Sequence, residues 1–256
     1  MTELAHLTWQ EAREALATAR LALLPVGSCE QHGPHLALDT DLAVAEAFAR
    51  RLEADLGEAA MLCPSIPYGL SEHHMGFPGT LTLRPAAFTG MLLDVVESLA
   101  RWGLRRVLMV NGHGGNIDAL RLVSRQARAD LGSLVASIMW AQLAADQIAP
   151  RVRSDQYGHA CEVETSVAMV LVADRVFPER IAPPRGRRSP DPLTDPPRPV
   201  VDQAVRMEEW TEDGALGDPR LASRELGEAV VEEAYGRALS FARRFAVAPL
   251  PQDQGR

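Results

Sequence analysis

Residues 21–41, LALLPVGSCEQHGPHLALDTD, join an uninterrupted apolar run to a stretch rich in acidic residues and histidines. The run at residues 21–26 predicts a buried β-strand, because strands of a parallel sheet are covered on both faces. Gly27 and Ser28 predict the turn that ends this strand. Residues 41–56 carry Ala and Leu at helical spacing and predict a helix.

The rest of the chain repeats this alternation of strand and helix. Strands are predicted at residues 60–66, 107–110 and 134–140, and helices at residues 85–102, 117–131, 162–172 and 220–245. This order predicts an α/β fold with a mostly parallel sheet. We expect one domain over residues 1–256, with an exposed Pro- and Arg-rich loop at 183–200 and a flexible tail at 251–256.

The composition excludes several classes of function. The formal net charge is −8 and no basic run is present, so binding to nucleic acid or to an anionic membrane is not expected. All basic residues are Arg, which leaves no Lys for Schiff-base chemistry. The three cysteines lie far apart without a CxxC pair, the N-terminus lacks a signal-peptide pattern, and no apolar run reaches the length of a membrane helix. We therefore expect a cytoplasmic protein.

Six of the seven histidines fall in four short segments that are rich in glycine or acidic residues. In the first segment, Glu30 and His32 follow the strand at 21–26 and are two residues apart, so in extended backbone they point the same way. Active sites of α/β folds lie at this carboxyl edge of the sheet. Asp41 stands where the next helix begins, and its carboxylate either caps that helix or binds a metal ion.

Two further segments place histidines beside predicted secondary structure. His113 lies in NGHGGN, directly after the strand at 107–110, and is either a surface histidine or a metal ligand. His159, Glu162 and Glu164 lie in HACEVETS, where a helix begins. Acidic residues in a first helical turn also favour the helix dipole. If the segment is helical, Glu162 and Glu164 face different ways, so only one of them is expected to be a ligand.

The fourth segment, SEHHMGFPGT at residues 71–80, places polar side chains in a loop that Gly and Pro constrain. We predict that Ser71, Glu72 and His73 contact the substrate, with an ordered turn as the alternative. Taken together, imidazoles and carboxylates without paired thiols indicate Zn, Mn or Fe. Several carboxylates with two histidines predict two metal ions joined by a bridging carboxylate, a centre suited to amide hydrolysis.

The stretches GSCEQHGPHLALDTD, FPGTL, NGHGGN, HACEVETS and GALGDPRLASRELGE resemble the creatininase (creatinine amidohydrolase) family, in the family's order. The resemblance implies a three-layer α/β/α fold, two divalent metal ions and a homo-oligomer, often a hexamer. The metal ligands that it implies are Glu30, His32, Asp41, His113 and Glu164, with Asp41 bridging the two ions. It also implies that His159 acts on the proton of the leaving nitrogen.

The chain departs from creatininases proper at two places. Gly114 and Gly115 replace a Tyr-Glu pair, and residues 153–156 replace tryptophans that line the creatinine pocket. The expected function is therefore a metal-dependent amidohydrolase that cleaves a non-peptide C–N bond in a small polar or cyclic amide or formamide. The alternatives are a peptidase that trims a modified peptide precursor, a non-catalytic binding or scaffold protein, and a metal-dependent isomerase or lyase.

Overall fold

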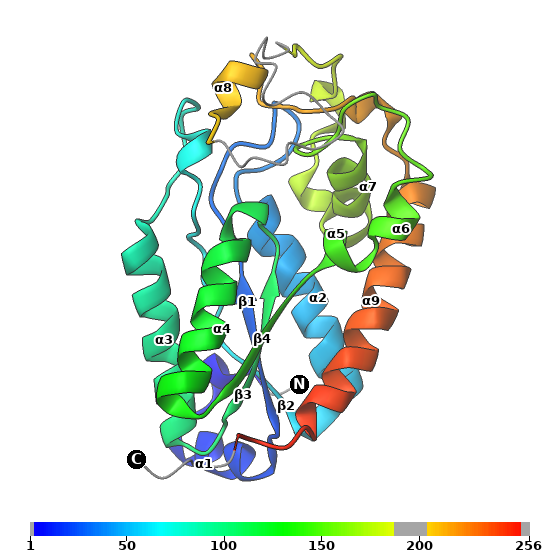
Figure 1. Cartoon of the computed structure of the whole chain (residues 1–256). Coiled ribbons are helices and arrows are strands. Elements are labelled where there is room, and N and C mark those ends of the chain that lie inside the picture. The colour runs from blue at the N-terminus through cyan, green and yellow to red at the C-terminus, as the bar shows by residue number, and fades with distance from the viewer. Residues whose placement is uncertain (1–2, 187–203, 252–256) are drawn as a thin grey trace.

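The computed structural model describes residues 3–186 and 204–251. Within these ranges the centre of the molecule is a parallel sheet of four strands in the order β2-β1-β3-β4. The strands are β1 (Leu21–Val26), β2 (Ala60–Leu62), β3 (Arg106–Asn111) and β4 (Leu134–Met139). Helices cover both faces of this sheet (Figure 1), which confirms the predicted α/β fold.

The first core lies between one face of the sheet and helices α2 (Thr40–Leu56), α7 (Glu162–Leu171) and α9 (Arg224–Ala246). Leu21 and Leu23 of β1 point into this core. Both side chains are fully buried, as expected for an interior strand of a parallel sheet.

The second core lies on the opposite face, under α3 (Pro85–Arg101) and α4 (Ile117–Leu131). Ala22 and Leu24 of β1 point into it, because successive side chains of a strand alternate between the two faces. Figure 1 shows α3 and α4 on one side of the sheet, with α2 and α9 on the other. Strand β1 therefore contributes to both cores, which explains its unbroken apolar sequence.

The remaining helices are short or lie at the periphery. They are α1 (Trp9–Thr18), α5 (Trp140–Leu143), α6 (Ala145–Ile148), α8 (Met207–Trp210) and the 3₁₀ turns η1 (Leu4–His6), η2 (Gly57–Ala59), η3 (Glu72–His74), η4 (Gly114–Asn116), η5 (Ala173–Arg175), η6 (Pro178–Arg180) and η7 (Pro219–Leu221). None of the helices in the described ranges is long and apolar enough to cross a membrane.

Two predicted elements differ from the structure by more than one residue at an end. The second strand was expected at 60–66, but β2 ends at Leu62, and Pro64, shortly after it, has no N–H to donate to a sheet. The last helix was expected from residue 220, but α9 begins at Arg224, after Ser223 accepts a hydrogen bond from the Leu226 N–H. Of the predicted loop at 183–200 only 183–186 lie within the described residues, and of the tail at 251–256 only residue 251 does.

Candidate metal centre

The loops that follow β1 and β3 meet above the sheet because these strands are neighbours and run parallel. The first loop carries Glu30 and His32, and the second carries His113. Two glycines let the first turn of α2 approach both loops. A Cβ added at Gly27 would lie 2.4 Å from the Leu42 Cα. Gly112 is similarly close to the backbone of α2, so this packing brings Asp41 between the two loops.

The Asp41 carboxylate lies between two histidines and is buried. Its Oδ1 is 3.2 Å from His32 Nε2, and its Oδ2 is 3.2 Å from His113 Nδ1. The residue at the N-cap of α2 is Asp39, so Asp41 does not cap the helix. Of the two roles that the sequence left open, the geometry thus excludes capping. Each carboxylate oxygen faces a different imidazole, an arrangement that would allow the carboxylate to be shared by two ions.

The Glu30 carboxylate lies fully buried at the centre of the cluster. Ser28 and Ser71 donate hydrogen bonds to its Oε2 over 2.8 Å and 2.6 Å. The same oxygen lies 3.2 Å from His113 Nε2, and Oε1 lies 3.2 Å from His74 Nε2. The two hydroxyls therefore fix the carboxylate in an orientation that faces the histidines.

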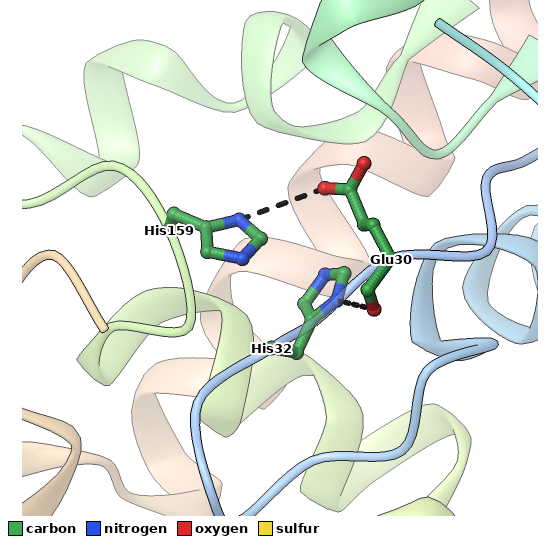
Figure 2. A group of neighbouring side chains, drawn as sticks. All are labelled: Glu30, His32 and His159. Carbon is green, nitrogen blue, oxygen red and sulfur yellow. Dashed lines mark hydrogen bonds and ion pairs between the residues drawn. The ribbon is translucent and has the colours of Figure 1, made fainter. Parts of the chain in front are cut away.

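Figure 2 shows His159 and His32 on the same side of Glu30. His159 Nε2 lies 2.6 Å from the main-chain oxygen of Gln31, so this nitrogen carries the proton and donates it to the carbonyl. The other ring nitrogen, Nδ1, lies 3.8 Å from Glu30 Oε1 and 3.9 Å from Glu164 Oε2. The main chain thus selects the tautomer whose free lone pair faces the carboxylates.

The two glutamates of the HACEVETS segment face different directions, as the sequence predicts for a helix. Glu164 faces His159 and accepts a hydrogen bond from the Ala160 N–H. Ala160 has a φ of 46°, in the left-handed region that costs a non-glycine residue about 1 kcal/mol or more. Glu162 faces away from the histidines and accepts hydrogen bonds from two main-chain N–H groups of the segment before His159.

Charges in the cluster depend strongly on one another because Glu30, His32, Asp41 and His113 are buried and Glu164 is largely so. Burial opposes a charged His32, but the carboxylates of Asp41, Glu164 and Glu30 raise its pKa to about 10. Burial also opposes ionisation of Glu30, yet the neighbouring histidines hold its pKa well below the ordinary value. Burial raises the pKa of Glu164 to about 7. The raised pKa values of His32 and His113 favour protonated imidazoles that balance the carboxylates, and divalent ions would supply the same balance with these imidazoles neutral.

The donor set fits divalent metal ions. Two groups of side chains hold possible ligand atoms within 4.8 Å of one another: Glu30 with Asp41 and His113, and Glu30 with His32 and His159. Glu30 Oε1 and Asp41 Oδ2 are buried and have no hydrogen-bond partner among the described residues. Such oxygens are costly to bury unless a cation or donor meets them. Carboxylates with imidazoles are the ligands that Zn, Mn and Fe take in proteins.

The residues predicted to contact the substrate lie in different environments. Ser71 is buried and bound to Glu30, and Glu72 is exposed. His73 is half-buried, with its ring stacked on that of His113 at a centroid distance of 5.7 Å. Sequence reasoning missed His74, which is buried against Glu30 and His159. It also missed Gln31, whose side-chain amide lies 2.8 Å from His74 Nδ1. The signal available in the sequence was that Gln31 directly follows Glu30 and that His74 directly follows His73.

A cavity of about 660 Å³ lies beside the segments that carry His159. Its lining includes Arg153, Asp155, Trp210, Leu216 and Asp218, and thus combines charged with apolar side chains. Leu216 pairs with His159 through two main-chain hydrogen bonds. One wall of the cavity is therefore continuous with the backbone of the histidine.

The family model that describes creatinine amidohydrolases matches residues 5–242 of the chain. A mycofactocin precursor peptide peptidase from Mycolicibacterium smegmatis is 32% identical over 87% of this chain and 84% of its own length. A creatinine amidohydrolase from Pseudomonas putida is 30% identical over 89% of this chain and 90% of its own length.

Solved structures give the same result. A crystal structure of creatinine amidohydrolase has a TM-score of 0.79 and 27% identity, and the match covers 97% of this chain and 99% of that one. A manganese form of creatininase has a TM-score of 0.77 and 27% identity, with 96% and 99% covered. A Zn–Zn form of a creatininase mutant has a TM-score of 0.75 and 28% identity, with 96% and 98% covered. The chain, with its buried cluster of histidines and carboxylates, therefore belongs to the creatininase family of hydrolases.

Proposed function

We propose that this chain is a hydrolase that uses two divalent metal ions to cleave an amide C–N bond. The observation that carries the proposal is the buried Asp41 carboxylate, whose two oxygens each lie 3.2 Å from a different histidine. Glu30, Asp41 and His113 would hold one ion. His32, Asp41 and Glu164 would hold the other. Zinc is the ion we expect, with manganese and iron as alternatives.

Bound divalent ions supply Lewis acidity, which lowers the pKa of water and polarises a carbonyl group. The chain's own residues supply the orientation and the proton transfer. Ser28 and Ser71 hold the Glu30 carboxylate in place. The proton on His159 Nε2 stays hydrogen-bonded to the Gln31 carbonyl. The other ring nitrogen, Nδ1, is therefore the atom that takes up a proton and passes it to the leaving nitrogen.

We propose a small polar or cyclic amide, or a formamide, as the substrate. The burial of Glu30, His32, Asp41 and His159 supports this choice, because a buried site admits a compact substrate most easily. A second candidate function is the trimming of a peptide. The cavity of about 660 Å³, lined in part by Leu216, which pairs with His159, favours it, because that volume would hold the residues that flank a scissile peptide bond. Similarity to the mycofactocin precursor peptide peptidase supports the same candidate.

The test begins with elemental analysis of the purified chain. We expect close to two transition-metal ions per chain. If the chain holds no metal even after reconstitution with zinc or manganese, a non-catalytic binding protein is favoured instead. The metal-loaded chain is then incubated separately with cyclic amides, formamides and short peptides, and mass spectrometry identifies the products. Addition of one water to the cleaved substrate supports hydrolysis. A product of unchanged mass would instead indicate an isomerase.

A further inference from the structure

Glu162 is a fully buried carboxylate that takes no part in the metal cluster. It opens α7 two residues before Glu164, but its Oε1 accepts hydrogen bonds from the N–H groups of Arg153, over 2.9 Å, and Ser154, over 2.7 Å. Charge-assisted hydrogen bonds of this kind are about twice as strong as neutral ones. Two of them offset part of the cost of burying this carboxylate, whose other oxygen, Oε2, has no hydrogen-bond partner among the described residues.

The segment that Glu162 holds has no regular structure of its own. Residues 151–158 form neither helix nor strand, so no repeating hydrogen-bond pattern fixes their backbone. Arg153 and Ser154 also line the cavity beside His159. The position of this part of the cavity wall therefore depends on the contact with Glu162.

The held segment is tied in turn to the chain that pairs with His159. The Asp218 N–H donates to Ser154 Oγ over 2.9 Å, and the Arg153 guanidinium donates to the Leu221 carbonyl over 2.9 Å. Just before Asp218, the Leu216 N–H donates to the His159 carbonyl over 2.7 Å, and the His159 N–H donates back over 3.4 Å. Contacts thus run from Glu162 through Ser154 and Asp218 to Leu216, which forms an isolated antiparallel bridge with His159.

We propose that Glu162 is a positioning residue for the reaction: it fixes residues 153–154, and through them the segment 216–218, which pairs with His159 and forms one wall of the cavity. This inference rests on the proposed function, in which His159 moves the proton. Glu162 contacts neither substrate nor metal. Its role differs from that of Glu164, although both are glutamates in the first turn of one helix.

The experiment compares Glu162→Ala, Glu162→Gln and the control Glu164→Gln, each purified with its metals. Glu162→Ala is expected to keep the wild-type metal content, to lower kcat on the order of tenfold, because a small displacement of a reacting group has effects of this size, and to raise KM. Glu162→Gln keeps an oxygen that accepts both N–H groups and is expected to stay close to wild type. Glu164→Gln is expected to lose metal.

Hydrogen exchange provides a readout that does not depend on turnover. In Glu162→Ala, the amides of Arg153, Ser154 and Asp218 are expected to exchange faster than in wild type. Ser154→Ala, which leaves Glu162 intact, is expected to speed exchange at Asp218 and to lower kcat less. This variant keeps the test decisive if Glu162→Ala does not fold.

Two results would overturn the inference: wild-type kcat, KM and exchange rates in Glu162→Ala, or loss of metal in Glu162→Ala to the same extent as in Glu164→Gln. If the wild-type chain cleaves no amide, the proposed function fails instead. Exchange at the His159 and Asp218 amides still shows in that case whether Glu162 positions them, so the two failures are distinguishable.

Discussion

Gly112 and Asp41 are in such close contact that a Cβ added at Gly112 would lie 2.0 Å from the Asp41 main-chain oxygen. Cβ atoms are not found so close to another heavy atom, so only a residue without a side chain fits at this position. Gly112 thus lets the start of α2 lie against the loop that carries His113. The position of the Asp41 carboxylate between two histidines therefore depends on the absence of a side chain at Gly112, in the loop that follows β3.

The first prediction concerns this contact. Gly112→Ala is expected to push α2 from the loop, to destabilise the fold by about 1–3 kcal/mol as in other overpacked sites, and to lower metal content. Denaturant unfolding and elemental analysis measure the two effects. Gly114→Ala is the matched control, because a Cβ there would meet no atom within 4 Å. Equal stability and metal content in the two variants would contradict the prediction.

The second prediction tests the bridging role of Asp41. Asp41→Asn keeps the size of the side chain but removes the charge that two ions would share, so it is expected to lose most of the bound metal and most of the activity. Elemental analysis and steady-state kinetics check both. Two ions per chain with full turnover would mean that Asp41 has no part in the centre.

The third prediction separates proton transfer from metal binding at His159. His159→Gln is expected to keep both ions while kcat falls by about 10²–10⁴, the usual contribution of general acid–base catalysis. Because His159 also lies close to Glu30 and His32, the opposite result has a clear meaning. Loss of one ion per chain would make His159 a ligand rather than a proton carrier.

The fourth prediction concerns metal removal. Ions that bind only the folded chain stabilise it by about 2.7 kcal/mol at a free concentration 100 times Kd. For a chain of this size, chelation is therefore expected to lower Tm by roughly 5–10 °C for each ion removed. Differential scanning calorimetry measures the shift. Asp41→Asn serves as the comparison, since a chelator should change its Tm little.

Much of the fold could be predicted because hydrophobic periodicity carries it directly. The helix at 117–131 was predicted to the residue, and the strand at 21–26 likewise, because each presents an apolar pattern matched to its burial. The boundaries that failed depend on local hydrogen bonding. Ser223 accepts a hydrogen bond from the Leu226 N–H at the start of α9, a contact that hydrophobic spacing does not reveal.

The residues of the site were harder to predict from the sequence than the fold. The spacing of Glu30 and His32 indicated that both face one way, and both are buried beside Asp41 and His113. His74 was missed because residues 72–74 form a 3₁₀ turn, in which neighbouring side chains point about 120° apart. Alternation along the chain could not show whether His73 or His74 faces the centre.

The contact between the His159 ring and the Gln31 main-chain oxygen joins residues 128 positions apart. The proposed ligands Glu30 and Glu164 are at least as far apart in the sequence, so the ligand group exists only when both halves of the chain have closed on each other. Metal ions should therefore bind late in folding, after the rate-limiting step. They would leave the refolding rate almost unchanged and would slow unfolding instead. A coloured ion such as cobalt at this centre would then report the opening of the whole molecule rather than of one loop.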